Sequence, residues 1–195
     1  MPKVTSFDRI AEVAAKRFVA DGYAAVSLRA IADELSIKPA SLYYHCPRGK
    51  TELFARALAT YFDGYRVGLV AAAGRARVPR SAFRMADWML EHPPVDPQRI
   101  IRTDLPQLAA ADADLVMQAL HEAVLGPFVK TFQQARTNGE LPQTVDPAIA
   151  ASAVVALVDG LGFQHLPAGR PPSDQELSAV RANLHAGMRM LKGLG

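Results

Sequence analysis

The chain has 195 residues, of which 50% are hydrophobic and 21% are charged, and this composition is typical of a globular protein. Its formal net charge of +3 is mildly basic, which permits a nucleic-acid partner without requiring one. The single cysteine excludes an internal disulfide, a zinc site built from several cysteines and a CxxC redox pair.

Apolar residues recur at spacings of three and four along the chain, which predicts helices, and no alternating strand pattern is present. A first helix is expected over 6–20, and it should end at Asp21-Gly22 because glycine can adopt a left-handed conformation. Ser27 is a good N-cap for a second helix. A third helix should begin near Lys38-Pro39, since proline fits a first helical turn, and should end at Pro47.

The rest of the chain has the punctuation of a helical bundle. Further helices are expected at about 51–73, 81–91, 97–108, 112–137, 147–166 and 173–192. Proline and glycine clusters separate most of these segments, for example at 74–79, 92–94, 138–139 and 167–172. The sequence therefore predicts an all-α fold of about nine helices.

Residues 27–50 predict two short helices joined by a tight turn, and the second has the composition of a helix that lies in the major groove of DNA. Its first residues are small or able to form hydrogen bonds, as a groove about 12 Å wide requires. The aromatic and imidazole rings that follow carry polar tips that can reach phosphates. We expect DNA contacts from Ser27, Arg29, Lys38, Pro39, Ala40, Ser41, Tyr43, Tyr44, His45 and Lys50. The alternative is that Leu42, Tyr43 and Tyr44 are core residues, which we expect for Leu42 and in part for Tyr43.

The segment resembles the N-terminal DNA-binding domain of the TetR family of bacterial transcriptional repressors over about residues 7–54. The resemblance depends on the segment GYAAVSLRAIADELSIKPASLYYHCPRGKTEL, which begins at Gly22. It implies phosphate contacts from Ser27, Tyr43, His45 and Lys50, and base or near-base contacts from Arg29, Pro39, Ala40, Ser41 and Tyr44. It also implies a DNA-binding domain at 1–52 and a helical domain at 53–195 for ligand binding and dimerisation.

Two residues depart from the pattern of this family. Ser36 occupies the turn position that is commonly glycine, where a left-handed conformation would cost about 1 kcal/mol and could shift the turn. Cys46 replaces the usual phenylalanine after the histidine, which removes a large apolar anchor. Oxidation of Cys46 beside the third helix would disturb DNA binding, but a reactive thiol requires a lowered pKa.

The segment 147–166 is apolar on nearly all sides, so it must be buried on more than one side. We expect it to form a homodimer interface together with 173–192, with the same surface used by both subunits. The alternative is that it is only the core of the monomer.

Large apolar and aromatic residues of the middle helices suggest a pocket for a moderately hydrophobic ligand. The expected lining residues are Phe83, Trp88, Met89, Arg102, Met117, His121, Leu125 and Phe128. Since aromatic residues at helical spacing are usually core, the alternative is a packed interior. Arg102 and Asp104 could instead lie on a solvated face or pair locally.

We therefore expect a cytoplasmic, homodimeric DNA-binding regulator that a small effector releases from a palindromic double-stranded operator. The competing hypothesis is an all-helical small-molecule-binding protein without specific DNA binding. No enzymatic activity, cofactor or metal site is expected, because no catalytic set, phosphate-binding loop or histidine pair with metal-ligand spacing occurs. No signal peptide or membrane span is expected either, since no long apolar run marks one.

Overall fold

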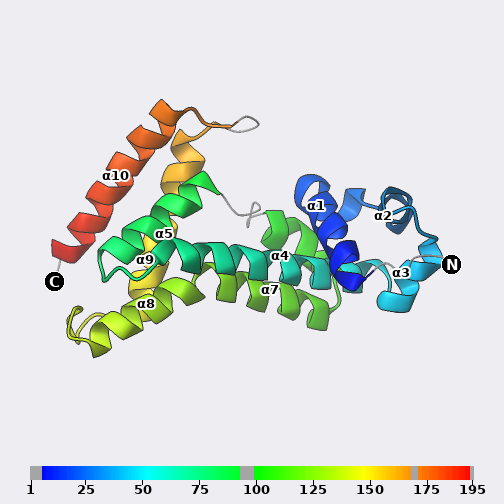
Figure 1. Cartoon of the computed structure of the whole chain (residues 1–195), viewed down its shortest axis with the longest axis horizontal. Helices are drawn as coiled ribbons and strands as arrows, with labels where there is room; N and C mark the ends of the chain where they lie inside the picture. Colours follow the sequence, from blue (N-terminus) through cyan, green and yellow to red (C-terminus); the bar gives the residue numbers. More distant parts are fainter. Residues whose placement is uncertain (1–5, 93–98, 168–170, 194–195) are drawn as a thin grey trace. The chain divides into compact units, whose positions relative to one another are not determined.

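The computed structural model describes residues 6–92, 99–167 and 171–193, and this part of the chain is helical without a strand (Figure 1). The expected all-α fold is confirmed. The helices form two compact units, an N-terminal unit of Met1–Tyr65 with Pro94–His121 and a C-terminal unit of Arg66–Pro93 with Glu122–Gly195. The predicted boundary between a DNA-binding domain at 1–52 and a regulatory domain at 53–195 stays a prediction. The compact units do not follow this boundary, because residues 94–121 pack with the N-terminal helices.

The N-terminal unit begins with α1 (Phe7–Ala25), α2 (Leu28–Glu34) and α3 (Pro39–His45), followed by the start of α4 (Lys50–Ala73). One face of α1 is buried, from Ile10 to Phe18, as its apolar spacing predicts. The regular helix breaks at the expected position, because Gly22 has a φ of 80°. The hydroxyl of Ser27 accepts a hydrogen bond from the backbone N–H of Ala30 at 3.1 Å, which confirms the predicted N-cap.

The same unit contains an irregular segment where a helix over 97–108 was expected, and residues 97 and 98 lie outside the described residues. A π-helical turn, η1 (Ile100–Asp104), passes into a 3-10 turn, η2 (Leu105–Gln107), before α7 (Ala110–Val124). Pro106 explains the irregularity, because it has no N–H for the carbonyl one helical turn earlier.

This irregular segment holds the break in α1. Arg99 donates hydrogen bonds to the carbonyl oxygens of Phe18 and Val19, at 3.0 and 2.7 Å. The carboxylate of Asp104 is buried and accepts from the backbone N–H of Tyr23 at 3.0 Å. The carbonyls and N–H freed by the break are thus satisfied by side chains.

The C-terminal unit contains α5 (Arg80–Glu91), α8 (Gly126–Thr137), α9 (Pro147–His165) and α10 (Asp174–Gly193). The prediction of one helix over 112–137 is wrong, because α7 ends at Val124 and α8 begins at Gly126. Pro127 causes the interruption by removing a backbone donor. Within the unit α9 packs against α5, α8 and α10 (Figure 1), and its buried positions include Ala151, Val154 and Val158.

Candidate functional site

The helix α3 has one buried and one exposed face. Leu42 and the following Cys46 are buried, which confirms Leu42 as a core residue. Pro39, at the first position of the helix, is exposed, and so are Ala40 and Ser41. Tyr44 is 82% exposed and Tyr43 is 51% exposed, so only part of the second ring is buried. The outward face is therefore small at its start and carries two aromatic rings with hydroxyl groups.

The turn between α2 and α3 keeps the left-handed conformation although no glycine is present. Ser36 has a φ of 54°, the only positive value of a non-glycine residue in the described part of the chain. Its backbone N–H donates to the carbonyl of Asp33, and that of Ile37 donates to Ala32, both at 3.0 Å. These two hydrogen bonds close the turn and hold Ser36 in a left-handed backbone conformation, which is strained for serine but not for glycine.

The other expected DNA contacts lie at the start of α2, at the two ends of α3 and at the start of α4. Ser27, Arg29 and Lys38 are exposed, although the hydroxyl of Ser27 is already used for the N-cap of α2. Arg29 lies 4.0 Å from Asp33, in a pair whose side chains are both largely exposed to solvent. His45 is half-buried against the rings of Phe7 and Tyr44, so its ring has limited freedom.

Lys50 is held within the protein. Its ammonium donates to the carbonyl of Ala24 at 3.3 Å and lies 4.4 Å from the centre of the Tyr23 ring. Partial burial lowers the pKa of Lys50 from its usual value, and the nearby carboxylate of Asp104 opposes this shift. Contact with a phosphate would require Lys50 to exchange these partners.

Two arginines that sequence reasoning did not select hold the C-terminal end of α3. Arg56 donates to the carbonyl of His45 at 2.6 Å. Arg48 forms two hydrogen bonds to the carboxylate of Asp112, at 2.8 and 3.0 Å, and Asp112 is only 2% exposed. The spacing of Glu52 and Arg56 on α4 is a sequence signal for an ion pair. No comparable signal exists for Arg48 and Asp112, because 64 positions separate them.

Cys46 has the environment of a structural cysteine. Burial raises the pKa of its thiol, which outweighs the opposing effect of Arg56. Because the thiolate is the reactive form, this environment disfavours the redox role considered from the sequence.

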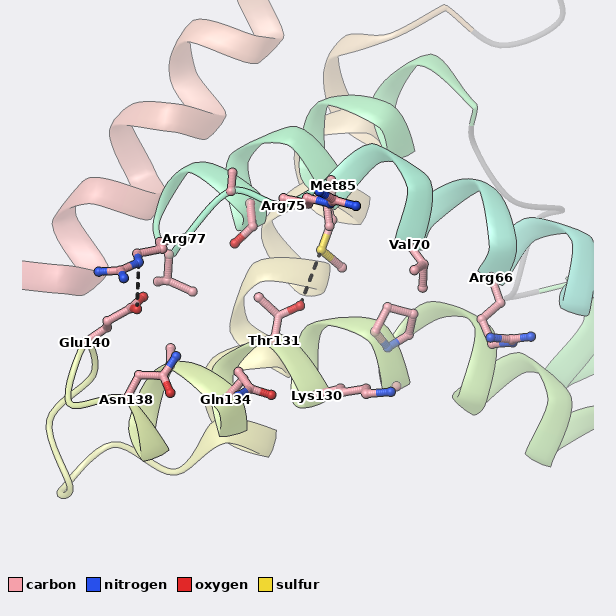
Figure 2. A pocket seen from close by; sticks show the side chains of 18 of the residues that line it. Arg66, Val70, Arg75, Arg77, Met85, Lys130, Thr131, Gln134, Asn138 and Glu140 are labelled. Atoms are coloured by element: carbon pink, nitrogen blue, oxygen red, sulfur yellow. Dashed lines mark hydrogen bonds and ion pairs between the residues drawn. The ribbon is translucent and has the colours of Figure 1, made fainter.

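The C-terminal unit contains a cavity of about 520 Å³ formed by the end of α4, the start of α5 and α8 (Figure 2). Both charged and apolar side chains line it, and Figure 2 shows Arg75 and Arg77 on one side and Lys130, Thr131 and Gln134 on the other. The complete lining is Arg66, Val70, Ala73, Gly74, Arg75, Ala76, Arg77, Val78, Ser81, Met85, Glu122, Gly126, Pro127, Lys130, Thr131, Gln134, Ala135, Asn138 and Glu140.

None of the eight residues expected to line a ligand pocket lines this cavity. Arg102, Met117 and His121 belong to the N-terminal unit and are exposed. Met89 and Phe128 are buried in the core of the C-terminal unit. That unit also contains Phe83, Trp88 and Leu125, all half-buried. Arg102 and Asp104 are the two residues for which the alternative was a solvated face or a local pair. Arg102 is exposed. Asp104 is buried and pairs locally with Arg99, at 3.6 Å.

Large apolar side chains are exposed on α9 and α10. Phe163 is 91% exposed and Ile149 is 72% exposed on α9, and Met190 of α10 is also exposed. By length and composition, α9 is the one helix among the described residues that could cross a membrane, although only 28% of its apolar window is buried. One such helix is weak evidence for a membrane span, since the core helix of a soluble protein can have the same length and composition. Among the described residues no group of three or more His, Cys, Asp or Glu side chains could hold a metal ion.

Comparison with known proteins agrees with this geometry. Residues 10–57 match the model for bacterial regulatory proteins of the tetR family, and residues 84–189 match the model for the C-terminal region of BetI-type transcriptional repressors. No curated protein matches the chain in sequence.

Solved structures with the same fold include three regulators. PfmR, a TetR family transcriptional regulator from Thermus thermophilus, is 23% identical with a TM-score of 0.58, over 93% of this chain and 97% of its own. A protein from Saccharomonospora viridis in complex with choline is 23% identical with a TM-score of 0.68, over 94% and 95%. AibR, in complex with isovaleryl coenzyme A and operator DNA, is 21% identical with a TM-score of 0.61, over 91% and 96%. At these identities the likeness shows the fold alone.

Proposed function

The chain belongs to the TetR family of bacterial transcriptional regulators, and on this premise we propose that it is a homodimeric repressor that a small-molecule effector releases from a palindromic operator. The observation that carries the proposal is the two-sided character of α3. Leu42 and Cys46 anchor it in the N-terminal unit, while its opposite face is exposed. A helix held in this way can enter the major groove without losing its own packing.

The side chains on this face divide by the contacts they can make. Ala40 and Pro39 are small enough to approach a thymine methyl group, and Ser41 can donate to a base edge. Tyr44 is 82% exposed and the side chain of Arg29 is 86% exposed, and these two residues are our candidates for contacts that distinguish bases. Such contacts specify sequence, whereas phosphate contacts only set position.

We assign phosphate contacts to the remaining expected residues. Tyr43 and His45 carry polar groups on stiff rings, and Ser27 and Lys38 lie at the N-terminal ends of α2 and α3, where backbone amides favour anions. Lys50 could join them by exchanging its contact with Ala24 for a phosphate oxygen.

The apolar surface of α9 and α10 supports a homodimer. Phe163, Ile149 and Met190 would be costly to leave in water, and a second copy of the chain could cover them. A two-fold dimer would present two α3 helices to the two halves of a palindrome. DNA is the target of such a dimer, so we propose that it acts in the cytoplasm.

We propose that the cavity of the C-terminal unit is the effector site. The solved relatives that hold choline and isovaleryl coenzyme A support a small-molecule effector for this chain as well. An effector can release the operator only by its difference in affinity between the free and the DNA-bound forms of the protein. The family is one of transcriptional regulators, so we propose no enzymatic activity.

Binding to DNA tests the proposal most directly. Fluorescence anisotropy with fragments flanking the gene should find a palindromic fragment whose binding weakens steeply with salt, because phosphate contacts release counterions. Tyr44→Ala and Arg29→Ala should each reduce operator affinity about fivefold or more. Arg80→Ala removes the same charge as Arg29→Ala from an exposed position of α5 and should leave affinity nearly unchanged.

Two outcomes would overturn the proposal. One is the absence of specific, salt-sensitive binding to any flanking fragment while a small molecule still binds, which would favour a helical ligand-binding protein. The other is a monomeric wild-type protein, and light scattering measures the oligomeric state. Phe163→Glu should yield a monomer, whereas Val67→Glu, at another exposed apolar position, should not. A wild-type protein that is monomeric at micromolar concentration would contradict the dimer.

A further inference from the structure

The cavity of the C-terminal unit is rich in positive charge. Four basic side chains line it, from Arg66, Arg75, Arg77 and Lys130, against two acidic ones, so the lining carries a net charge of +2. Glu140 pairs with Arg77, since its carboxylate lies 3.5 Å from Nε of Arg77 (Figure 2).

Arg75 and Lys130 provide the charge that remains available. Neither side chain has a hydrogen-bond or ion-pair partner in the described part of the chain. Both line the same cavity from different elements, since Arg75 follows α4 and Lys130 lies on α8 (Figure 2). Because two cations that face one cavity repel each other, an anion between them is favoured by both.

A buried hydroxyl gives a second, independent indication of a ligand. Ser81 lines the cavity and is only 2% exposed, yet its Oγ has no hydrogen-bond partner within the described residues. Leaving a buried hydroxyl unpaired is unfavourable, and such groups are rare in folded proteins. An oxygen of a bound ligand would satisfy this group.

The apolar part of the lining defines the rest of the ligand. Val70, Val78, Met85 and Pro127 offer surface for a short hydrocarbon chain. No tryptophan, tyrosine or phenylalanine lines the cavity, whereas a quaternary ammonium is usually recognised by aromatic faces. Both the missing aromatic faces and the positive charge disfavour a cationic ligand.

We propose that the effector is a small amphipathic organic anion, with a carboxylate or phosphate group held by Arg75, Lys130 and the hydroxyl of Ser81, and with a short apolar body against Val70 and Met85. This inference rests on the proposed function, in that the cavity is taken as the effector site. A volume of about 520 Å³ lies within the usual range of small-ligand pockets.

A matched set of eight-carbon probes separates the ligand classes by calorimetry. Octanoate and octyl phosphate should bind, and their relative affinity identifies the preferred head group. Octanol and octyltrimethylammonium should bind at least about tenfold more weakly, because they lack the negative charge. Binding of octanoate should also weaken as salt is raised, since the cations are exposed. Equal or tighter binding of the cation would overturn the proposal.

Variants of the lining locate the site. Lys130→Gln and Arg75→Gln should each weaken octanoate binding about five- to tenfold. Arg80→Gln is the control, since it removes a positive charge from an exposed neighbouring position outside the cavity. Ser81→Ala should weaken binding while leaving the melting temperature of the free protein unchanged or higher, because it removes an unpaired polar group. A purely structural role for Ser81 would predict a lower melting temperature, and unchanged binding in all three lining variants would refute the site.

The operator assay distinguishes a failed ligand class from a failed regulator. If octanoate binds through these residues but does not release operator DNA, the ligand class stands and the effector role is wrong. If operator DNA binds normally and neither anion binds at millimolar concentration, the regulator stands and the ligand class is wrong.

Discussion

Two glycines on α4 should respond oppositely to the same substitution. A Cβ at Gly68 would overlap with Cζ2 of Trp88 and lie 2.9 Å from its Cη2, well inside van der Waals contact. A Cβ at Gly64, one turn earlier, would have no neighbouring atom within 4 Å. The indole of Trp88 is stacked against the ring of His92, with centroids 4.5 Å apart, which limits its movement away from Gly68.

The magnitudes follow from these surroundings. In a helix interior alanine is more favourable than glycine by about 0.5–1 kcal/mol, so Gly64→Ala should stabilise the protein by about that amount. Gly68→Ala has the same backbone gain but must also displace the Trp88 ring, and such overpacking costs about 1–3 kcal/mol. The two variants should therefore differ by about 1–3 kcal/mol, which corresponds to about 2–12 °C in melting temperature at this chain length.

Thermal unfolding followed by circular dichroism measures this difference, and fluorescence identifies its cause. Trp88 is the only tryptophan, so its emission should change in Gly68→Ala and stay as in the wild type in Gly64→Ala. In a Trp88→Phe background, which removes the two closest atoms, Gly68→Ala should approach the stability gain of Gly64→Ala. An equal gain for both variants in the wild-type background, with unchanged emission, would contradict a clash between a side chain at position 68 and Trp88.

Three further outcomes are expected. Arg48→Ala leaves the buried carboxylate of Asp112 without its guanidinium partner and should lower the free energy of unfolding in urea by about 1–3 kcal/mol. Arg17→Ala, in a more exposed pair, should lower it by less than about 1 kcal/mol. Equal losses would contradict a stabilising contact between Arg48 and Asp112. Ser36→Gly relieves a positive φ and should stabilise by about 0.5 kcal/mol, so a lower urea midpoint would argue against strain there. Cys46 is buried and its thiol has a raised pKa, so at pH 8 its thiolate fraction is below that of an unfolded cysteine. An aromatic disulfide reagent should therefore label the native chain about tenfold more slowly than the urea-unfolded chain. Equal labelling rates would show that the thiol is accessible.

The helix-turn-helix could be predicted from sequence because its determinants are local. The N-cap of Ser27 and the proline at the start of α3 each depend on residues within one helical turn. The departure at Ser36 was also visible in the sequence. Its result was not, because the balance between a shifted turn and a strained serine depends on how α2 and α3 pack.

The cavity shows where local patterns fail. Most of the expected pocket residues are large and apolar or aromatic, and such residues are the ones that a helical bundle buries in its core, as Met89 and Phe128 show. The cavity that formed has charged and small residues instead, among them Ser81 and Lys130. The sequence does not indicate that the hydroxyl of Ser81 is buried without a hydrogen-bond partner within the described residues.

Local sequence patterns predict that the chain is helical and where most of its helices begin and end, and they indicate the surface that we propose to contact DNA. These properties depend on periodicity and capping, which act over three or four residues. Packing between helices brings Arg48 to Asp112 and Lys50 to Ala24, and it leaves a cavity with basic lining between α4, α5 and α8. Each of these depends on helices distant in the chain meeting at a particular angle, and the apolar pattern of a single helix does not specify that angle.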